Sequence, residues 1–138
     1  MMKIAKEFKW EMGHRLPEHF GQCKNIHGHS YKMRVELDGE PDESGMVLDY
    51  YILQQIINPI VKRLDHAFLV YKDDLEVISF LEKLNSKKVI VDFQSTVENL
   101  VLYFLDEMKK EKFPSNITSL SVRVHETSED FAEASVKL

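Results

Sequence analysis

The sequence predicts an α+β domain in which an antiparallel four-stranded sheet carries helices on one face. Segments in which apolar and polar residues alternate, as in β-strands, stand near both ends of the 138-residue chain. Between them lie segments whose apolar residues recur at helical spacing. Because the order is two strands, helices and then two strands, we expect the helices to pack on the same side of the sheet.

The first two predicted strands cover residues 3–14 and 27–38. In the first, the even positions are mostly apolar and end at His14. In the second, the odd positions hold His27 and His29 followed by apolar residues, whereas the even positions are polar. Residues two apart in a strand share a face. All three histidines are therefore expected on the apolar faces of neighbouring strands.

The middle of the chain predicts two helices and a short strand. The first helix should begin near Asp49, whose side chain can cap it, and its apolar stripe runs to Leu64. Pro59 lies inside this stripe and should bend the helix, since proline removes one backbone hydrogen bond. A short helix is expected over 75–84 and a brief strand over 89–93.

The last part of the chain predicts a further helix and two strands. Ser95 and Glu98 form the Ser-x-x-Glu pattern of a capping box, and apolar residues at helical spacing follow over 97–108. Apolar residues then alternate over 120–124, which predicts a third long strand, and over 134–138, which predicts the fourth.

The composition limits the possible functions. A formal net charge of −5 argues against non-specific binding to nucleic acid. The start of the chain has no apolar signal core, and no uncharged run is long enough to span a membrane. The single cysteine, Cys23, excludes an internal disulfide and favours a reduced, cytoplasmic setting. The length fits one domain over residues 1–138.

The three histidines His14, His27 and His29 could hold one metal ion. Three imidazoles are the ligand set of a catalytic zinc that keeps its fourth position open. A single histidine on an apolar face is more often a hydrogen-bonded core residue, but three on adjacent strands favour a metal site. Gly28, between two of them, is expected to mark a place of close packing or of an unusual backbone dihedral.

Two further places could carry proton chemistry. Cys23 lies in a loop beside a lysine, four residues before His27, and this setting favours the reactive thiolate. It could equally be an inert small residue, or the fourth ligand of a closed structural zinc site. Asp65 and His66 follow the first helix, and either could exchange a proton with a partner elsewhere. As neighbours they are not expected to pair with each other, and a helix end that favours a cationic histidine is the alternative.

Glu126 could bind a ligand. It has the same parity as the apolar residues of the third long strand, and a carboxylate on such a face is costly to bury without a partner. It could accept two N–H donors from a ligand. The alternative is that the strand ends there and the face becomes solvated.

Six segments carry a combined pattern that runs almost from end to end of the chain. They are FKWEMGHRLP (8–17), CKNIHGHSY (23–31), GMVLD (45–49), LDHAFL (64–69), STVENL (95–100) and VRVHET (122–127). With these motifs the chain resembles the 6-pyruvoyl-tetrahydropterin synthase and 6-carboxytetrahydropterin synthase family. It departs from that family at Ser95, where members often have proline, and over 70–93, which is longer than in compact members.

The resemblance implies a tunnelling fold, in which subunits join their sheets into an oligomeric barrel, commonly a homohexamer. It implies the following site residues: His14, His27 and His29 as ligands of Zn2+; Cys23 as the catalytic thiolate; Asp65 and His66 as its proton-relay partners; and Glu126 as the pterin anchor, with Thr96 and Glu98 nearby. The relay pair could be supplied across a subunit boundary. Arg15, Lys24 and Lys32 lie near the motifs as candidate cations for a triphosphate, and the sequence does not choose among them.

The resemblance also implies the reaction. The family substrate is 7,8-dihydroneopterin triphosphate, a small molecule, and neither nucleic acid nor membrane is an expected partner. A zinc-dependent lyase would eliminate triphosphate and release acetaldehyde to give 6-carboxy-5,6,7,8-tetrahydropterin, for 7-deazaguanine and queuosine precursors. The alternatives are a 6-pyruvoyl-tetrahydropterin synthase and a non-catalytic pterin- and zinc-binding module. Variants that release 6-hydroxymethyl-dihydropterin tend to have glutamate where Cys23 stands.

Overall fold

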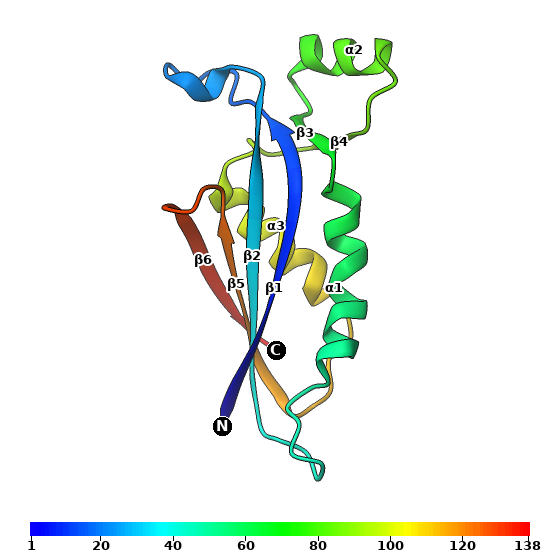
Figure 1. The fold of residues 1–138 in the computed structure, drawn as a ribbon, viewed down its shortest axis with the longest axis vertical. Coiled ribbons are helices and arrows are strands. Elements are labelled where there is room, and N and C mark those ends of the chain that lie inside the picture. Colours follow the sequence, from blue (N-terminus) through cyan, green and yellow to red (C-terminus); the bar gives the residue numbers. More distant parts are fainter.

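A computed structural model describes residues 1–138, and its strands form one mixed sheet of six strands in the order β4-β3-β1-β2-β5-β6 (Figure 1). The strands are β1 (Met2–His14), β2 (His27–Gly39), β3 (Ala67–Tyr71), β4 (Lys88–Val91), β5 (Ile117–His125) and β6 (Phe131–Lys137). The helices are the 3-10 turn η1 (Gln22–Lys24), α1 (Tyr50–Leu64), α2 (Leu75–Lys83) and α3 (Val97–Lys109). None of these helices is long and apolar enough to cross a membrane.

The four predicted strands are present, but the predicted sheet was too small. β1, β2, β5 and β6 pair antiparallel, and β1 and β2 stay in register from Met2 opposite Gly39 to His14 opposite His27. β3 then joins β1 in parallel, and β4 joins β3 in parallel. Strand β3 is not predicted by the sequence pattern, because its five residues AFLVY are nearly all apolar and lack the alternation that marks a half-exposed strand.

The helices α1 and α3 pack together on one face of the sheet; in the view of Figure 1, α3 passes behind the strands and α1 stands beside β1. Asp49 caps α1 as predicted, since its carboxylate accepts a hydrogen bond of 2.8 Å from the amide of Tyr51. The helix continues through Pro59 to Leu64. Helix α2 lies between β3 and β4, at the end of the sheet where β1 ends and β2 begins.

Aromatic side chains form the part of the core nearest to the end of β1. Trp10 stacks on Tyr31 at 5.3 Å between ring centroids, and Phe104 of α3 meets Trp10 edge-on at the same distance. All three side chains are almost fully buried. Stacked and edge-to-face rings at this spacing restrict each other's rotation. The strand segment that leads to His14 and the one that follows His29 therefore rest on a rigid base.

Helix α3 begins one residue later than predicted. Thr96, and not Ser95, is the N-cap, and its hydroxyl accepts a hydrogen bond of 3.1 Å from the amide of Asn99. Ser95 is buried and bonds to the ring of His14 instead. The Ser-x-x-Glu pattern was misleading because the next residue, threonine, is also a good cap. The capping box with Glu98 is thus absent.

Replacing Thr96 with alanine should lower the free energy of unfolding by about 1 kcal/mol, the typical cost of losing a capping hydroxyl. Urea unfolding at one fixed protein concentration measures this change. Thr96→Ser keeps a capping oxygen and should retain most of the stability. An equal loss in both variants would contradict the capping role.

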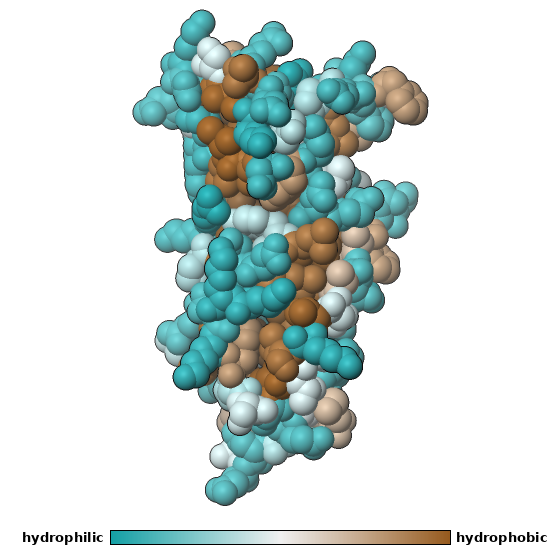
Figure 2. Space-filling model, turned by 180° about the vertical axis from the view of Figure 1, so that it is seen from behind, coloured by the Kyte–Doolittle hydropathy of each residue, from teal (hydrophilic) through white to brown (hydrophobic).

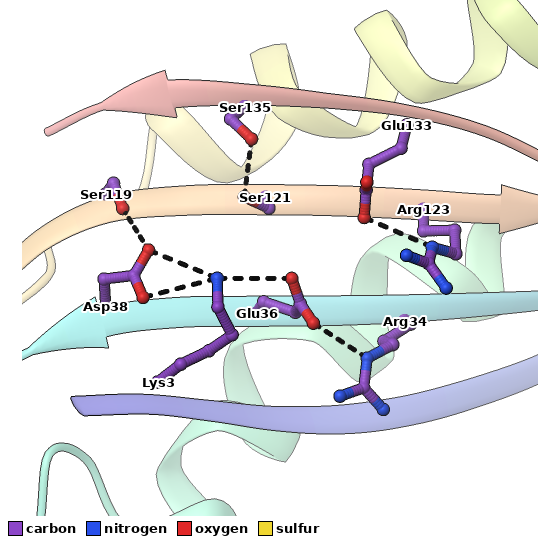
Figure 3. Close-up of polar contacts among 9 residues, drawn as sticks. All are labelled: Lys3, Arg34, Glu36, Asp38, Ser119, Ser121, Arg123, Glu133 and Ser135. Carbon is purple, nitrogen blue, oxygen red and sulfur yellow. Dashed lines mark hydrogen bonds and ion pairs between the residues drawn. The ribbon is translucent and has the colours of Figure 1, made fainter.

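The other face of the sheet is covered by neither α1 nor α3 and carries a network of polar pairs (Figure 3). Lys3 on β1 contacts Glu36 and Asp38 on β2 at 3.4 and 3.3 Å, and Ser119 on β5 donates to Asp38 at 2.7 Å. Farther along the sheet, Arg34 pairs with Glu36, and two pairs join β5 to β6 (Figure 3). The alternation seen in the sequence thus places apolar side chains under the helices and charged pairs on the open face.

Candidate active site

The three predicted histidines gather at one point, where β1 ends and β2 begins. His14 lies directly opposite His27 in the strand register, and His29 is the next residue of β2 on the same face. One ring nitrogen of each lies within 4.8 Å of the others. His14 is 1% exposed, and its Nε2 is 3.2 Å from the Nε2 of His29. This three-histidine group can hold a metal ion.

The surroundings of the rings suit metal ligands. The Nδ1 of His14 is 2.9 Å from the backbone carbonyl oxygen of Ser95, and the Nδ1 of His27 is 2.6 Å from that of Asn25. A ring whose Nδ1–H donates to a carbonyl presents the lone pair of Nε2, which is how ligating histidines are usually oriented. The chemistry of the donor set therefore fits a zinc ion.

Burial also keeps the rings in the form that binds a metal. It lowers the pKa of His14 to about 4, and it is the largest cause of the lowered pKa of His29. Both rings are thus neutral at neutral pH. Gly28 lies between two of the ligands where the strands are close, since a Cβ there would be only 3.0 Å from the carbonyl oxygen of Met12. The expected close packing at this glycine is confirmed.

Glu126 points at the histidine group from the end of β5. Its Oε1 lies 3.4 Å from the Nε2 of His14 and 3.5 Å from that of His29. It also lines a cavity of about 410 Å³ together with Tyr31, Lys32 and the turn after β5. The carboxylate therefore faces both the possible metal position and an open space large enough for part of a ligand.

Tyr31 is a site residue that the sequence pattern marks only as part of an apolar strand face. Its hydroxyl is buried and has no hydrogen-bond partner. Burial raises its pKa, and the nearby charges of Glu126 and Cys23 raise it further. The ring of His29 lies edge-on to it at 5.6 Å. No sequence signal separated this tyrosine from an ordinary core aromatic residue.

Asp65 and His66 pair with each other, which corrects the expectation that neighbours would not. The Nδ1 of His66 is 3.0 Å from Oδ1 of Asp65. The pairing becomes possible because the backbone of His66 is left-handed, with φ at 60°. Glu11 holds both residues, since its amide donates to Asp65 Oδ1 at 2.9 Å and its carbonyl accepts from the His66 amide at 2.7 Å.

The Asp65–His66 pair is accessible to solvent, and His66 shares a cavity with His29. The amide of Glu11, and then His66, hold the pKa of Asp65 below its usual range. The side chain of His66 is 76% exposed. It lines a cavity of about 430 Å³ together with Glu11, His29 and Lys87. Asp65 can therefore orient the ring while the other ring nitrogen stays accessible.

The remaining predicted site residues lie outside the three-histidine group. Cys23 is half-buried in η1, and its carbonyl accepts a hydrogen bond of 2.8 Å from the amide of Leu16. Cys23 is outside the group of three side chains that could share a metal ion. Thr96 uses its hydroxyl as a helix cap, and Glu98 is exposed on the first turn of α3. Neither lines the two cavities that contain His29 and Glu126.

Arg15 is already paired. Its guanidinium makes two hydrogen bonds, of 2.8 and 2.6 Å, with the buried carboxylate of Asp74 just before α2. Such a two-pronged pair is strong and geometrically specific. Arg15 therefore joins the end of β1 to the α2 segment, and Lys32, 3.8 Å from Glu7, remains the more available cation on the strands.

Fold and site together define an α+β protein with a group of three histidines, able to hold a metal ion, at the end of a long β-hairpin. A family model described as 6-pyruvoyl tetrahydropterin synthase matches residues 3–136. The chain belongs to this family, as its motifs predicted.

Known proteins agree with this assignment. The 6-carboxy-5,6,7,8-tetrahydropterin synthase of Haemophilus influenzae is 35% identical, over 96% of this chain and 98% of its own. The enzyme of the same name from Rickettsia conorii is 27% identical, over 96% and 99%. Among solved structures, the 6-pyruvoyltetrahydropterin synthase of Plasmodium vivax has a TM-score of 0.80 at 20% identity, covering 99% of this chain and 98% of that one. The likeness to the Plasmodium vivax structure supports the fold of this chain.

Proposed function

We propose that the protein is a zinc-dependent lyase that converts 7,8-dihydroneopterin triphosphate and water into 6-carboxy-5,6,7,8-tetrahydropterin, triphosphate and acetaldehyde. The three-histidine group beside Glu126 is the observation that carries this proposal. The names of full-length relatives favour the carboxy product. Cytoplasmic synthesis of 7-deazaguanines, such as queuosine precursors, would use this product.

Each residue of the proposed site has one task. A zinc ion on His14, His27 and His29 would supply a Lewis acid that makes neighbouring C–H groups of the substrate more acidic. Glu126 accepts N–H groups of the pterin edge and thereby fixes the ring. The Cys23 thiolate removes a proton from the substrate side chain.

The Asp65–His66 pair completes the proton transfer. His66 returns a proton through its exposed ring nitrogen, while Asp65, 3.0 Å from Nδ1, sets the tautomer. The large exposure of the His66 side chain fits a ring that transfers a proton to a substrate bound by a neighbouring subunit. Thr96 and Glu98 are assigned a supporting place at the pterin end on family grounds.

Product identity tests the proposal. The zinc-loaded protein is incubated with 7,8-dihydroneopterin triphosphate, and the pterin product is identified by mass, with acetaldehyde measured in parallel. A carboxy-tetrahydropterin with equimolar acetaldehyde supports the proposal. A pyruvoyl-tetrahydropterin without acetaldehyde would favour the alternative that the family's description names, and an absence of any product would favour a binding module.

Replacing Glu126 with glutamine should weaken pterin binding by about 1.5–3 kcal/mol, because hydrogen bonds to a charged group lose that amount when the charge is removed. Calorimetric titration with neopterin measures the dissociation constant. Glu129→Gln removes one negative charge from the exposed turn nearby and is the matched control. Unchanged affinity in Glu126→Gln would place the pterin anchor elsewhere.

We also propose that this single domain assembles into the family's barrel, with a hexamer as the complete form. β4 and β6 are the edges of the sheet and offer unpaired backbone groups to other copies. Large apolar side chains stay exposed on the helices and on β4, among them Leu102, Phe80 and Ile90. Figure 2 shows brown apolar areas breaking the hydrophilic surface on the side opposite to the view of Figure 1. Apolar areas of this kind favour subunit contact.

Mixing of inactive variants tests a site shared between subunits. Cys23→Ala and His66→Ala proteins are combined under conditions that allow subunit exchange, which mass spectrometry follows. If the two residues meet from different chains, some mixed sites contain both intact side chains and activity returns. Exchange without recovered activity would reject the shared site, and a monomer in solution would reject the assembly.

A further inference from the structure

Lys87 ties the end of the α2 segment to the residues around the Asp65–His66 pair. Its Nζ donates hydrogen bonds to the backbone carbonyls of Lys62 and Asp65, at 2.9 and 2.7 Å. Both carbonyls belong to the end of α1, where the helix leaves carbonyl groups without partners inside the helix. A cation here also opposes the negative end of the helix dipole.

The strand pairing brings Lys87 to this place. β3 and β4 are parallel, with Phe68 opposite Lys88, and the amide of Phe68 donates to the carbonyl of Lys87 at 3.0 Å. The chain leaves β3, forms α2 and returns at β4, so that a residue far along the sequence lies beside Asp65. This pairing gives a task to the segment 70–93.

The corner that Lys87 holds is otherwise unfavourable. His66 has a left-handed backbone, and such a conformation costs about 1 kcal/mol or more in a residue other than glycine. Glu11 fixes the corner from the side of β1, through one bond to Asp65 and one to the His66 amide. Lys87 fixes it from the opposite side, through the Asp65 carbonyl. Without the second contact, the peptide between Asp65 and His66 could rotate.

Lys87 also lies in the wall of the cavity that contains His66 and His29. Its charge is thus close to the relay pair, while two of its three N–H donors bond to backbone oxygens. On these grounds we propose that Lys87 is a positioning residue for the Asp65–His66 pair, and that it acts on proton transfer through His66. This inference rests on the proposed lyase function.

Kinetics of three variants test the inference. Lys87→Met should lower kcat about tenfold or more, with KM and zinc content nearly unchanged, since small misplacements of a catalytic group have effects of this size. Lys87→Arg can still donate to two carbonyls and should keep most of kcat. Lys83→Met removes an exposed lysine of α2 as the control and should leave kcat unchanged.

A double variant separates positioning from a general effect on the fold. If Lys87 acts through His66, Lys87→Met should cause no further loss of the small residual kcat that the His66→Ala protein retains, measured at high enzyme concentration. An equal loss in that background, or an unchanged kcat in Lys87→Met alone, would overturn the inference.

Amide hydrogen exchange gives a readout that does not require turnover. The amides of His66 and Glu11 should exchange faster in Lys87→Met than in the wild type, and at the wild-type rate in Lys83→Met, because both amides bond within this corner. If the wild type forms no pterin product, the proposed lyase function is rejected. Amide exchange still tests whether Lys87 holds the backbone at Asp65 and His66. Unchanged exchange in Lys87→Met would overturn the positioning role whatever the activity.

Discussion

Replacing His27 with alanine is expected to remove bound zinc and turnover together. The ring of His27 is 4.6 Å from that of His14 and 4.8 Å from that of His29, between centroids, so its loss leaves two ligands. Loss of a group that merely orients a ligand costs about 10–100-fold in metal affinity, and loss of the ligand itself should cost more. Metal analysis after gel filtration and an activity assay on the same sample measure both effects.

His19→Ala is the matched control for this variant. His19 lies in the loop after β1, outside the three-histidine group, and its Nδ1 accepts a hydrogen bond from the Gly21 amide. This protein should keep one zinc per chain. Full zinc retention in both His27→Ala and His29→Ala would reject the metal site.

Replacing Cys23 with alanine is expected to abolish most turnover while zinc and pterin binding remain. A positioned general base contributes about 10²–10⁴-fold to a rate, and kcat should fall by this factor. Cys23 lies in η1, outside the group that could share a metal ion, although it is close enough to contribute to the raised pKa of Tyr31. It is therefore near the site without being placed as a ligand.

The zinc content of Cys23 variants decides whether Cys23 is a catalytic base or a structural zinc ligand. Cys23→Ala and Cys23→Ser are each assayed for zinc per chain, neopterin affinity and kcat. Loss of zinc with loss of the thiol would establish a closed, four-ligand site instead. Wild-type turnover in Cys23→Ala would assign the base to another residue.

The sequence predicted the parts of the fold in which one period is clear. The alternation in β1 and β2 placed His14, His27 and His29 on one face, and the strand register brings them together. The short strand β3 was missed because its residues are nearly all apolar, so that neither a strand nor a helix period could be read from it.

The residues that support the site could not be predicted from local patterns. The local pattern predicts Ser95 as a helix cap, yet its carbonyl lies 2.9 Å from the ring of His14, which is 81 positions away. Lys87 reaches the Asp65 carbonyl only because β4 returns beside β3. The pairing of Asp65 with His66 depends on one backbone angle. Each of these contacts depends on tertiary structure, which the local patterns of a single sequence do not reveal.

The pairing of β1 with β2 also bears on how the chain reaches its native state. A shift of one residue between the strands would turn one set of side chains to the opposite face, and His14 would then point away from His27 and His29. An ion that needs all three rings can bind only to the correctly aligned hairpin. At 100 times its dissociation constant, such a ligand favours the form that it binds by about 2.7 kcal/mol. With zinc as the proposed ion, its supply during synthesis would therefore select against misaligned chains, and the metal would act as a check on strand alignment before any substrate arrives.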